Sequence, residues 1–154
     1  SVLIINNKVG QPLDDFVLQE MRFCERIALL SQQNYYAWKH RLLCLTRRIH
    51  SNTDLKTSSL HCVSYDPSCL PFLLAELEKS TQWIQLHLSD SSAYHYRRIL
   101  LFLIEESASE DNCDWLAKEE EFMSELDSRY KNVGAQSRQV HLFALKNMIN
   151  AFNR

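Results

Sequence analysis

Apolar residues recur along most of the chain at spacings of three and four residues, which is the period of one buried face of an α-helix. The series Val17, Met21, Cys24 and Ala28 is the clearest case. This spacing predicts six helices that begin near residues 14, 35, 71, 91, 115 and 135. Most links between them are short, so neighbouring helices are expected to run antiparallel, in the pairs 14–49, 71–106 and 114–152.

Each predicted helix has a stripe of residues expected to face the core. In the second and fourth helices the stripes are Trp38, Leu42, Leu45 and Ile49, and Tyr94, Arg97, Leu101 and Ile104. In the third and sixth they are Leu74, Leu77, Ile84 and Leu88, and Val140, Phe143, Met148 and Phe152. In the fifth helix, by contrast, the run Glu119-Glu120-Glu121 is expected to be a solvated face.

Side-chain caps and polar stretches mark the boundaries between elements. Asn34, Asp90 and Asp114 each stand where a side-chain oxygen can accept the free amides at a helix start. Residues 1–13 are expected to form an extended N-terminal segment, and residues 50–69 a polar insertion between helical pairs. Residues 14–152 are therefore predicted to form one helical-repeat domain that carries this insertion.

Composition narrows the fold class to all-α. The 154 residues include only 2 Gly and 3 Pro, too few for the tight turns of sandwiches, barrels and doubly wound sheets. The same count excludes glycine-rich phosphate loops. A formal net charge of −2 gives no reason to expect nucleic acid or an anionic membrane as partner. No apolar run is long enough for a membrane span.

The five cysteines, at positions 24, 44, 62, 69 and 113, do not form a metal-binding pattern. No pair has the C-x-x-C spacing, and His61 and Cys62 with Cys69 match zinc patterns poorly. We therefore expect no metal site in the chain and no cofactor bound by it. An odd number of scattered cysteines favours reduced thiols, and so a cytoplasmic protein.

A sequence repeat relates the second and fourth predicted helices. The segment Asn34-Tyr35-Tyr36-Ala37-Trp38-Lys39-His40-Arg41 aligns with Asp90-Ser91-Ser92-Ala93-Tyr94-His95-Tyr96-Arg97. Both copies have a capping residue, then Ala at the third position after it, an aromatic ring at the fourth and Arg at the seventh. The ring and the Arg are three residues apart and therefore share a helix face. A worn third copy would lie at Gln136-Ser137-Arg138, with Ala135 in place of the ring.

The pattern Asn-Tyr-x-x-Trp-x-x-Arg at the head of a second helix resembles the protein prenyltransferase alpha-subunit repeat. The first copy matches it in full, and the second keeps the Arg but has Asp for Asn and Tyr for Trp. The resemblance covers residues 14–106 well and 114–152 weakly. It implies a right-handed α-α superhelix, or crescent, of about three antiparallel helical hairpins. Several hairpins normally precede the full repeat in such proteins, so we expect a shortened or incomplete chain.

By resemblance, proteins of this kind are α subunits that wrap around a separate β subunit. The heterodimer transfers farnesyl or geranylgeranyl to a C-terminal cysteine of a protein substrate. Its β subunit holds the zinc and most of the isoprenoid diphosphate. The resemblance thus implies an α-type subunit, or a fragment of one, that binds and shapes a catalytic β partner. It implies transferase activity for the pair but none for this chain alone, and it assigns this chain no catalytic residue.

Two sets of residues in the repeat are candidates for function. Those that could face the β subunit or the substrate are Tyr35, Lys39, His40, Arg41, His95, Tyr96 and Arg97. Those expected to pack the repeats together are Asn34, Trp38, Asp90 and Tyr94. For Arg41 and Arg97 we favour a structural or interface ion pair over substrate contact. For His95 we favour a surface or interface role over proton transfer.

A second function class is a non-enzymatic helical-repeat adaptor that binds peptides or proteins. The tetratricopeptide form of that class requires a Trp-Leu-Gly-Tyr pattern in the first helix and a Pro that closes each unit. Neither stands at the required positions in this chain. The prenyltransferase subunit is therefore the preferred hypothesis.

Overall fold

The computed structural model describes residues 13–31, 34–49, 67–107 and 114–152. These residues form a short 3₁₀ turn, η1 (Pro67–Cys69), and six helices: α1 (Leu13–Leu30), α2 (Tyr35–Ile49), α3 (Leu70–Leu86), α4 (Ser91–Ser107), α5 (Trp115–Tyr130) and α6 (Ala135–Phe152). No residue in these ranges lies in a strand. The predicted all-α fold is confirmed.

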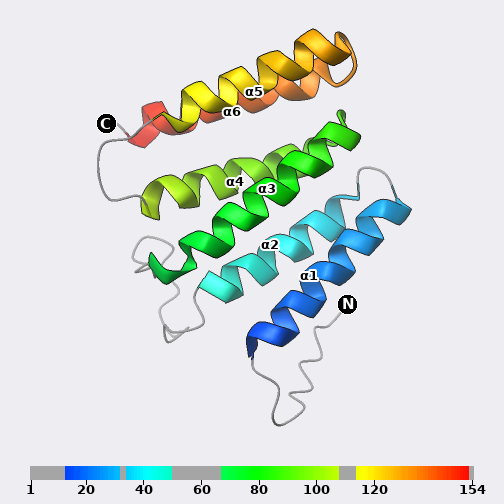
Figure 1. Cartoon of the computed structure of the whole chain (residues 1–154), viewed down its shortest axis with the longest axis vertical. Coiled ribbons are helices and arrows are strands. Elements are labelled where there is room, and N and C mark those ends of the chain that lie inside the picture. The colour runs from blue at the N-terminus through cyan, green and yellow to red at the C-terminus, as the bar shows by residue number, and fades with distance from the viewer. Residues whose placement is uncertain (1–12, 32–33, 50–66, 108–113, 153–154) are drawn as a thin grey trace.

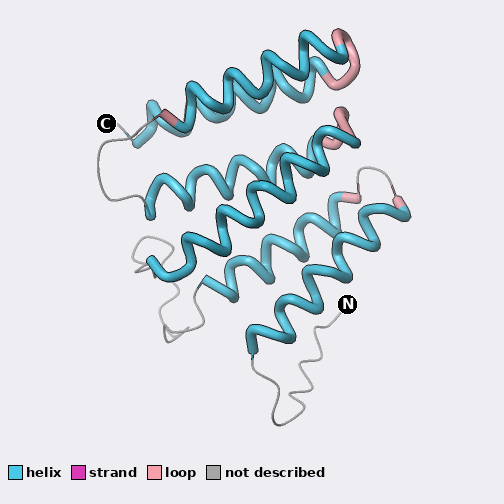
Figure 2. Tube along the Cα trace, viewed as in Figure 1, coloured by secondary structure: helices cyan, strands magenta, loops and turns pink. Residues whose placement is uncertain are grey.

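The helices are stacked as three hairpins in chain order, α1–α2, α3–α4 and α5–α6 (Figure 1). The two helices of each hairpin pack on each other, and between hairpins α2 packs on α4 and α4 packs on α6. The described residues outside the helices lie at the helix ends (Figure 2). The second helices of the hairpins, α2, α4 and α6, therefore form a continuous layer.

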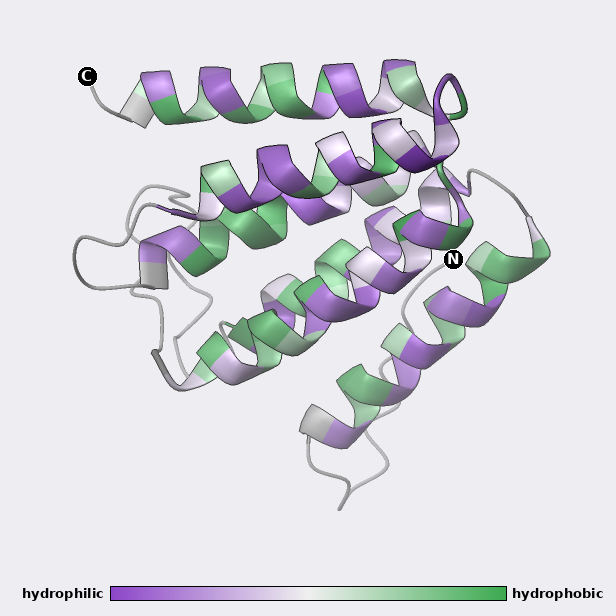
Figure 3. Ribbon diagram, turned by 45° about the horizontal axis from the view of Figure 1, so that its top comes forward, coloured by the Kyte–Doolittle hydropathy of each residue, from purple (hydrophilic) through white to green (hydrophobic). Residues whose placement is uncertain are grey.

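One apolar core runs through all three hairpins. Its buried members extend from Trp38 in α2 through Leu73 in α3 and Leu100 in α4 to Met123 in α5. Apolar and polar residues alternate along every helix (Figure 3), as expected when each helix buries only one side. Because one core is shared, each hairpin is stabilised in part by its neighbours in the stack.

Two of the predicted segments lie mostly outside the described residues: the extended N-terminus up to residue 12 and the polar insertion up to residue 66. Residues 108–113, between the second and third helical pairs, also lie outside them. The last residues of the insertion form η1, which leads directly into α3. Helix α3 then begins at Leu70 with Pro71 in its first turn, where a missing amide proton costs no helical hydrogen bond.

Several predicted core stripes need correction. The stripe Val17, Met21, Cys24 and Ala28 of α1 is buried, as predicted. In α3, Ile84 is fully buried as predicted, but Leu74 is 48% exposed and its neighbour Leu73 is fully buried instead. Leu73 lies on the same buried face as Glu76 and Trp83, which pack toward the first hairpin, so this face is wider than the predicted stripe.

The stripe predicted for α6 is wrong at its first two positions, while Met148 is half-buried and the Phe152 side chain lies outside the described residues. Val140 and Phe143 are exposed, while Arg138, His141 and Leu145 are buried. The physical reason is that two of these three buried residues are polar and have charged partners in α5, so hydrophobicity does not mark the packed face.

Two of the three predicted caps are confirmed. The Asn34 side chain accepts the amide of Ala37 at 3.1 Å, and the Asp90 side chain accepts the amide of Ala93 at 3.2 Å. Asp114 precedes α5, but its side chain makes no capping hydrogen bond. Its backbone is already helical, with φ −91° and ψ −1°, whereas a capping side chain needs extended backbone to reach the free amides.

Candidate interaction site on the second helices

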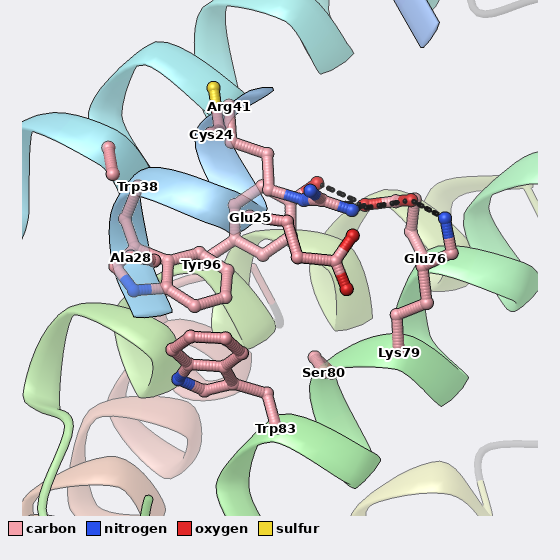
Figure 4. A pocket seen from close by; sticks show the side chains of 11 residues that line it. Cys24, Glu25, Ala28, Trp38, Arg41, Glu76, Lys79, Ser80, Trp83 and Tyr96 are labelled. Carbon is pink, nitrogen blue, oxygen red and sulfur yellow. Dashed lines mark hydrogen bonds and ion pairs between the residues drawn. The ribbon is translucent and has the colours of Figure 1, made fainter. Parts of the chain in front are cut away.

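The Arg41 guanidinium connects the first hairpin to the second. Its Nε and Nη2 atoms donate to both carboxylate oxygens of Glu76 in α3, at 2.9 to 3.0 Å (Figure 4). Its Nη1 donates to the main-chain oxygen of Met21 in α1 at 2.7 Å. The Tyr96 hydroxyl donates to the same Glu76 carboxylate at 2.8 Å. Arg41 is therefore held in a buried, bidentate ion pair between hairpins.

The same geometry recurs at the next junction. Arg97 donates from Nε and Nη2 to the two carboxylate oxygens of Glu119 in α5, at 2.6 and 2.8 Å. Its Nη1 donates to the main-chain oxygen of Leu77 at 3.2 Å, and Leu77 occupies in α3 the position that Met21 has in α1. We refer to Arg41–Glu76 and Arg97–Glu119 as the interhairpin ion pairs.

Glu119 corrects the prediction that the Glu119-Glu120-Glu121 run is solvated. Its side chain is 4% exposed, because position 119 faces α4 and Arg97. Burial by itself would raise the pKa of Glu119, but hydrogen bonds from Arg97 and His141 outweigh it and lower the pKa to about 2. The carboxylate is therefore charged throughout the physiological range.

His141 in α6 completes the second junction. Its Nε2 lies 2.8 Å from Glu119, and its Nδ1 lies 3.4 Å from Nη1 of Arg98. Burial lowers its pKa, and Glu119 offsets this only in part. A neutral imidazole that carries its proton on Nε2 fits both contacts, since it donates to Glu119 and accepts from Arg98.

Asp90 links three segments at the start of α4. One carboxylate oxygen accepts the indole N–H groups of Trp38 and Trp83, at 3.1 and 2.9 Å, and the other accepts the amide of Ala93. The two indoles meet edge to face with their ring centroids 5.4 Å apart. Trp38, Asp90 and Tyr94 are all buried, and these contacts fix the first two hairpins relative to each other.

A groove of about 340 Å³ opens between α2 and α4. We call it the second-helix groove; its lining residues are Tyr35, Trp38, Lys39, Leu42, Ser91, Ser92, His95 and Tyr96. Trp38 and Tyr96 are buried and form its floor, whereas Tyr35, Lys39 and His95 are exposed at its rim. A second groove of about 520 Å³ lies between α4 and α6, and Ser91 lines both.

The structure thus separates the seven residues predicted to face a partner or substrate. Four of them line the second-helix groove, namely Tyr35, Lys39, His95 and Tyr96. Arg41 and Arg97 lie inside the hairpin junctions instead. His40 points away from the groove toward α1, where its Nε2 lies 2.9 Å from Glu20.

The chemistry of the groove combines an aromatic floor with a single cation. The Lys39 ammonium lies over the Tyr35 ring, 5.9 Å from its centroid. Burial, and then the charge of Arg98, lower the pKa of His95, so its imidazole is uncharged at neutral pH. Such a site suits an apolar side chain that is accompanied by a carboxylate or another anionic group.

The described residues contain neither a candidate metal site nor a membrane-spanning helix. Within them, no group of three or more His, Cys, Asp or Glu side chains could hold a metal ion. In the same ranges, every helix is too short or too polar to cross a bilayer.

The acceptors Glu76 and Glu119 were not predicted from the sequence. A signal for one of them was present, because Glu20 and Glu76 stand at the same 56-residue offset as Arg41 and Arg97. When the first helices are aligned at this offset, a Glu recurs together with the Arg of the second helices.

The third repeat also lies in a different register from the predicted one. Because α6 begins at Ala135, Gly134 takes the capping position, Arg138 the position of the aromatic ring and His141 that of the Arg. Arg138 is fully buried and donates to Asp127 and to the main-chain oxygens of Lys131 and Val133. It therefore holds the turn between α5 and α6.

Several vertebrate proteins are similar in sequence to part of this chain. Protein prenyltransferase alpha subunit repeat-containing protein 1 of Danio rerio is 32% identical over 83 residues, 54% of this chain and 16% of that protein. The Homo sapiens protein of the same name is 32% identical over 85 residues, 55% of this chain and 17% of that protein. Repeat-containing protein 1-B of Xenopus laevis is 28% identical over 89 residues, 58% of this chain and 17% of that protein. The matched part spans about a sixth of their length.

The family model of the protein prenyltransferase alpha subunit repeat matches residues 17–48 and 73–104. These two matches coincide with the α1–α2 and α3–α4 hairpins. The second helices of these hairpins carry Arg41 and Arg97, which make the interhairpin ion pairs. The chain thus matches the protein prenyltransferase alpha subunit repeat in its first two hairpins and is similar over this part to proteins that contain the repeat.

Proposed function

We propose that this chain is an α-type subunit, or a fragment of one, of a heterodimeric protein prenyltransferase. In this proposal it binds a catalytic β subunit over the layer of second helices and supports transfer of farnesyl or geranylgeranyl to a C-terminal cysteine of a protein. Zinc and most of the isoprenoid diphosphate belong to the β subunit. The observation that carries the proposal is the second-helix groove, which lies on the layer of second helices in a chain that matches this repeat.

The division of roles among the basic residues supports this proposal. Arg41 and Arg97 are fully engaged between hairpins, so they stabilise the scaffold and are not available to a diphosphate or to a partner's carboxylate. Lys39 at the groove rim is exposed, so its ammonium group can reach such a partner. Tyr35 beside it offers a large ring with a polar end, a type of residue that is enriched at protein interfaces.

The buried thiols are consistent with a cytoplasmic site of action. Cys24 in α1 and Cys44 in α2 are both buried, and a hydrogen bond between their thiols has opposite effects on the two pKa values, lowering that of Cys24 and raising that of Cys44. Reduced thiols of this kind persist in a reducing compartment. We include cytoplasmic location in the proposal on this ground.

Co-purification with a farnesyltransferase or geranylgeranyltransferase β subunit tests the proposal directly. Each complex is assayed for transfer of labelled isoprenoid to a peptide that ends in a cysteine-containing motif. We expect Lys39→Glu to weaken β-subunit binding about tenfold, because it reverses the one charge at the groove rim. Lys118→Glu, at an exposed position of α5, is the matched control and leaves binding unchanged.

The outcomes separate the two function classes. Failure to co-purify with any such β subunit contradicts the proposal. Binding of a β subunit or of a peptide that depends on Lys39 but never supports transfer favours the non-enzymatic adaptor instead.

A further inference from the structure

A third groove lies on the side of the stack opposite to the turns within the hairpins. It has a volume of about 280 Å³ and is formed where α4 and α6 end and α5 begins. These three helix ends lie on the same side of the stack (Figure 1). The second-helix groove, by contrast, lies at the starts of α2 and α4, so the two grooves are at opposite ends of α4.

The walls of this third groove are largely apolar and come from three helices. Phe102 of α4 and Trp115 of α5 supply aromatic rings, and Leu145 and Met148 of α6 supply further apolar surface. Leu145 is buried, whereas the other three side chains are half-buried. Such a pocket is large enough to receive side chains of a partner and to exclude water from them.

The charge of this groove is negative. Glu105 and Glu106 near the end of α4 line it, and none of the described residues that line it is basic. Neither α4 nor α6 has a basic residue in its last turn. Lys146, the neighbour of Leu145 in α6, pairs with Glu120 of α5 at 2.8 Å. Because the C-terminal ends of helices also carry partial negative charge, the groove favours a cation.

The cation that fits these walls is organic. Within the described ranges, no group of three or more His, Cys, Asp or Glu side chains could hold a metal ion. A guanidinium or ammonium group suits carboxylates next to aromatic rings, because it can pair with the carboxylate and lie over a ring face. The apolar stem of such a side chain, or an apolar neighbour, packs on the remaining wall.

We propose that this groove binds a peptide segment of a partner protein in which an Arg or Lys stands beside an apolar residue. We call it the acidic groove and define it by Phe102, Glu105, Glu106, Trp115 and Met148. The cationic side chain of the peptide pairs with Glu105 and Glu106. Its apolar side chain packs on Trp115 and Met148, and aromatic and Met residues of this kind are enriched at protein interfaces.

The acidic groove and the second-helix groove should select peptides of opposite charge. The second-helix groove has the cation Lys39 at its rim and suits an apolar side chain accompanied by a carboxylate. The acidic groove has Glu105 and Glu106 in the corresponding role. Because the two grooves share no lining residue, peptide binding in the acidic groove does not depend on the prenyltransferase role.

Selection from a display library of random peptides on the full chain tests this proposal. We expect enrichment of peptides that combine Arg or Lys with aliphatic or aromatic residues, and the tightest of these is synthesised for isothermal titration calorimetry. Glu105→Gln/Glu106→Gln should weaken its binding about tenfold. Glu121→Gln/Glu125→Gln, the same change of charge at two exposed positions of α5, is the matched control and should leave binding unchanged.

The three tryptophans report which groove the peptide occupies. Trp115 lines the acidic groove, Trp38 lines the second-helix groove, and Trp83 is buried and lines neither. In NMR spectra of the ¹⁵N-labelled chain, the selected peptide should shift the indole N–H signal of Trp115. The signals of Trp38 and Trp83 should stay in place.

A single variant keeps the test decisive if the double variant at the end of α4 does not fold. Glu106→Gln changes an exposed side chain and should by itself weaken binding about threefold. The proposal would be overturned if no cationic peptide were enriched, or if the selected peptide shifted the Trp38 signal and not that of Trp115. Equal weakening by the Glu121→Gln/Glu125→Gln control would also overturn it, because the attraction would then come from the overall charge of the chain.

Discussion

At the start of α4, one carboxylate oxygen of Asp90 accepts the indoles of Trp38 and Trp83 while the other accepts the amide of Ala93. The aligned Asn34 in the first hairpin makes a simpler contact, since its amide oxygen accepts the Ala37 amide. A carboxylate has two acceptor oxygens, whereas an amide has one acceptor and one donor. Asp and Asn at the same position of the repeat are therefore not equivalent here.

Replacing Asp90 by Asn should destabilise the protein by about 1 to 3 kcal/mol. In one orientation the new amide NH₂ faces two indole donors, and in the other it faces the Ala93 amide, so a buried donor is left unsatisfied either way. Asn34→Asp keeps the accepting oxygen and should change stability by only a few tenths of a kcal/mol. Urea unfolding followed by tryptophan fluorescence measures both, and equal effects of the two variants would contradict this account.

Lowering the pH should destabilise the second junction through two groups, His141 and Glu119. The pKa of His141 is lower in the folded than in the unfolded chain, so the unfolded chain takes up this proton at a higher pH. Stability therefore falls as the pH drops below about 6.5. Glu119 has its pKa lowered from 4.5 to about 2. Its contribution is complete above about pH 4.5 and is lost as pH falls toward 2, about 3 kcal/mol in all.

Urea unfolding from pH 7 to pH 3 measures this loss. Glu119→Gln should be less stable at neutral pH and should show a shallower decrease below pH 4.5, because the titrating carboxylate is gone. The exposed Glu121→Gln is the control and should keep the wild-type slope. An unchanged slope in Glu119→Gln would show that other carboxylates cause the loss in acid.

At the scale of single elements, the turn between α5 and α6 depends on Gly134. Its φ of +73° lies in the left-handed region, and a Cβ there would overlap the main-chain oxygen of Leu88. Gly134→Ala should therefore destabilise the protein by more than about 1 kcal/mol, measured by the thermal unfolding midpoint. Ala135→Gly, one residue later and inside α6, is the control and should cost about 1 kcal/mol or less.

The positions of the helices could be predicted from sequence, because period and caps are local properties. All six predicted starts lie within about two residues of the observed ones, the usual uncertainty of helix ends. The packed face of α6 could not, because its buried residues Arg138 and His141 are polar and are stabilised by partners in α5. Burial there depends on contacts between elements, and those contacts are absent from the local pattern.

The candidate site was predictable only in part. Tyr35, Lys39 and His95 reach a common groove because the repeat places them at the starts of adjacent second helices. The sequence pattern also contained Arg41 and Arg97, but their function depends on Glu76 and Glu119 in other helices. Whether such an Arg is buried in a junction or exposed to a partner is a property of the assembled stack.

At the scale of the whole molecule, the main contacts between hairpins in the described residues join neighbours in the stack. Each junction has a buried ion pair whose acceptor lies in the following hairpin, Glu76 at the first and Glu119 at the second. Removing one partner of a buried pair leaves the other charged and poorly solvated, typically at a cost of about 3 kcal/mol. In a stack, the terminal hairpin beyond the altered junction should therefore unfold before the rest of the protein.

Glu76→Gln and Glu119→Gln are the matched pair of variants that tests this. Native-state hydrogen exchange should accelerate on the order of a hundredfold in α1–α2 for Glu76→Gln and in α5–α6 for Glu119→Gln. In each variant the opposite terminal hairpin should exchange nearly as in the wild type, because it shares no contact with the altered junction. Uniformly faster exchange in all six helices of either variant would contradict this prediction. It would mean that the three hairpins unfold as one cooperative unit, which the interhairpin ion pairs stabilise as a whole.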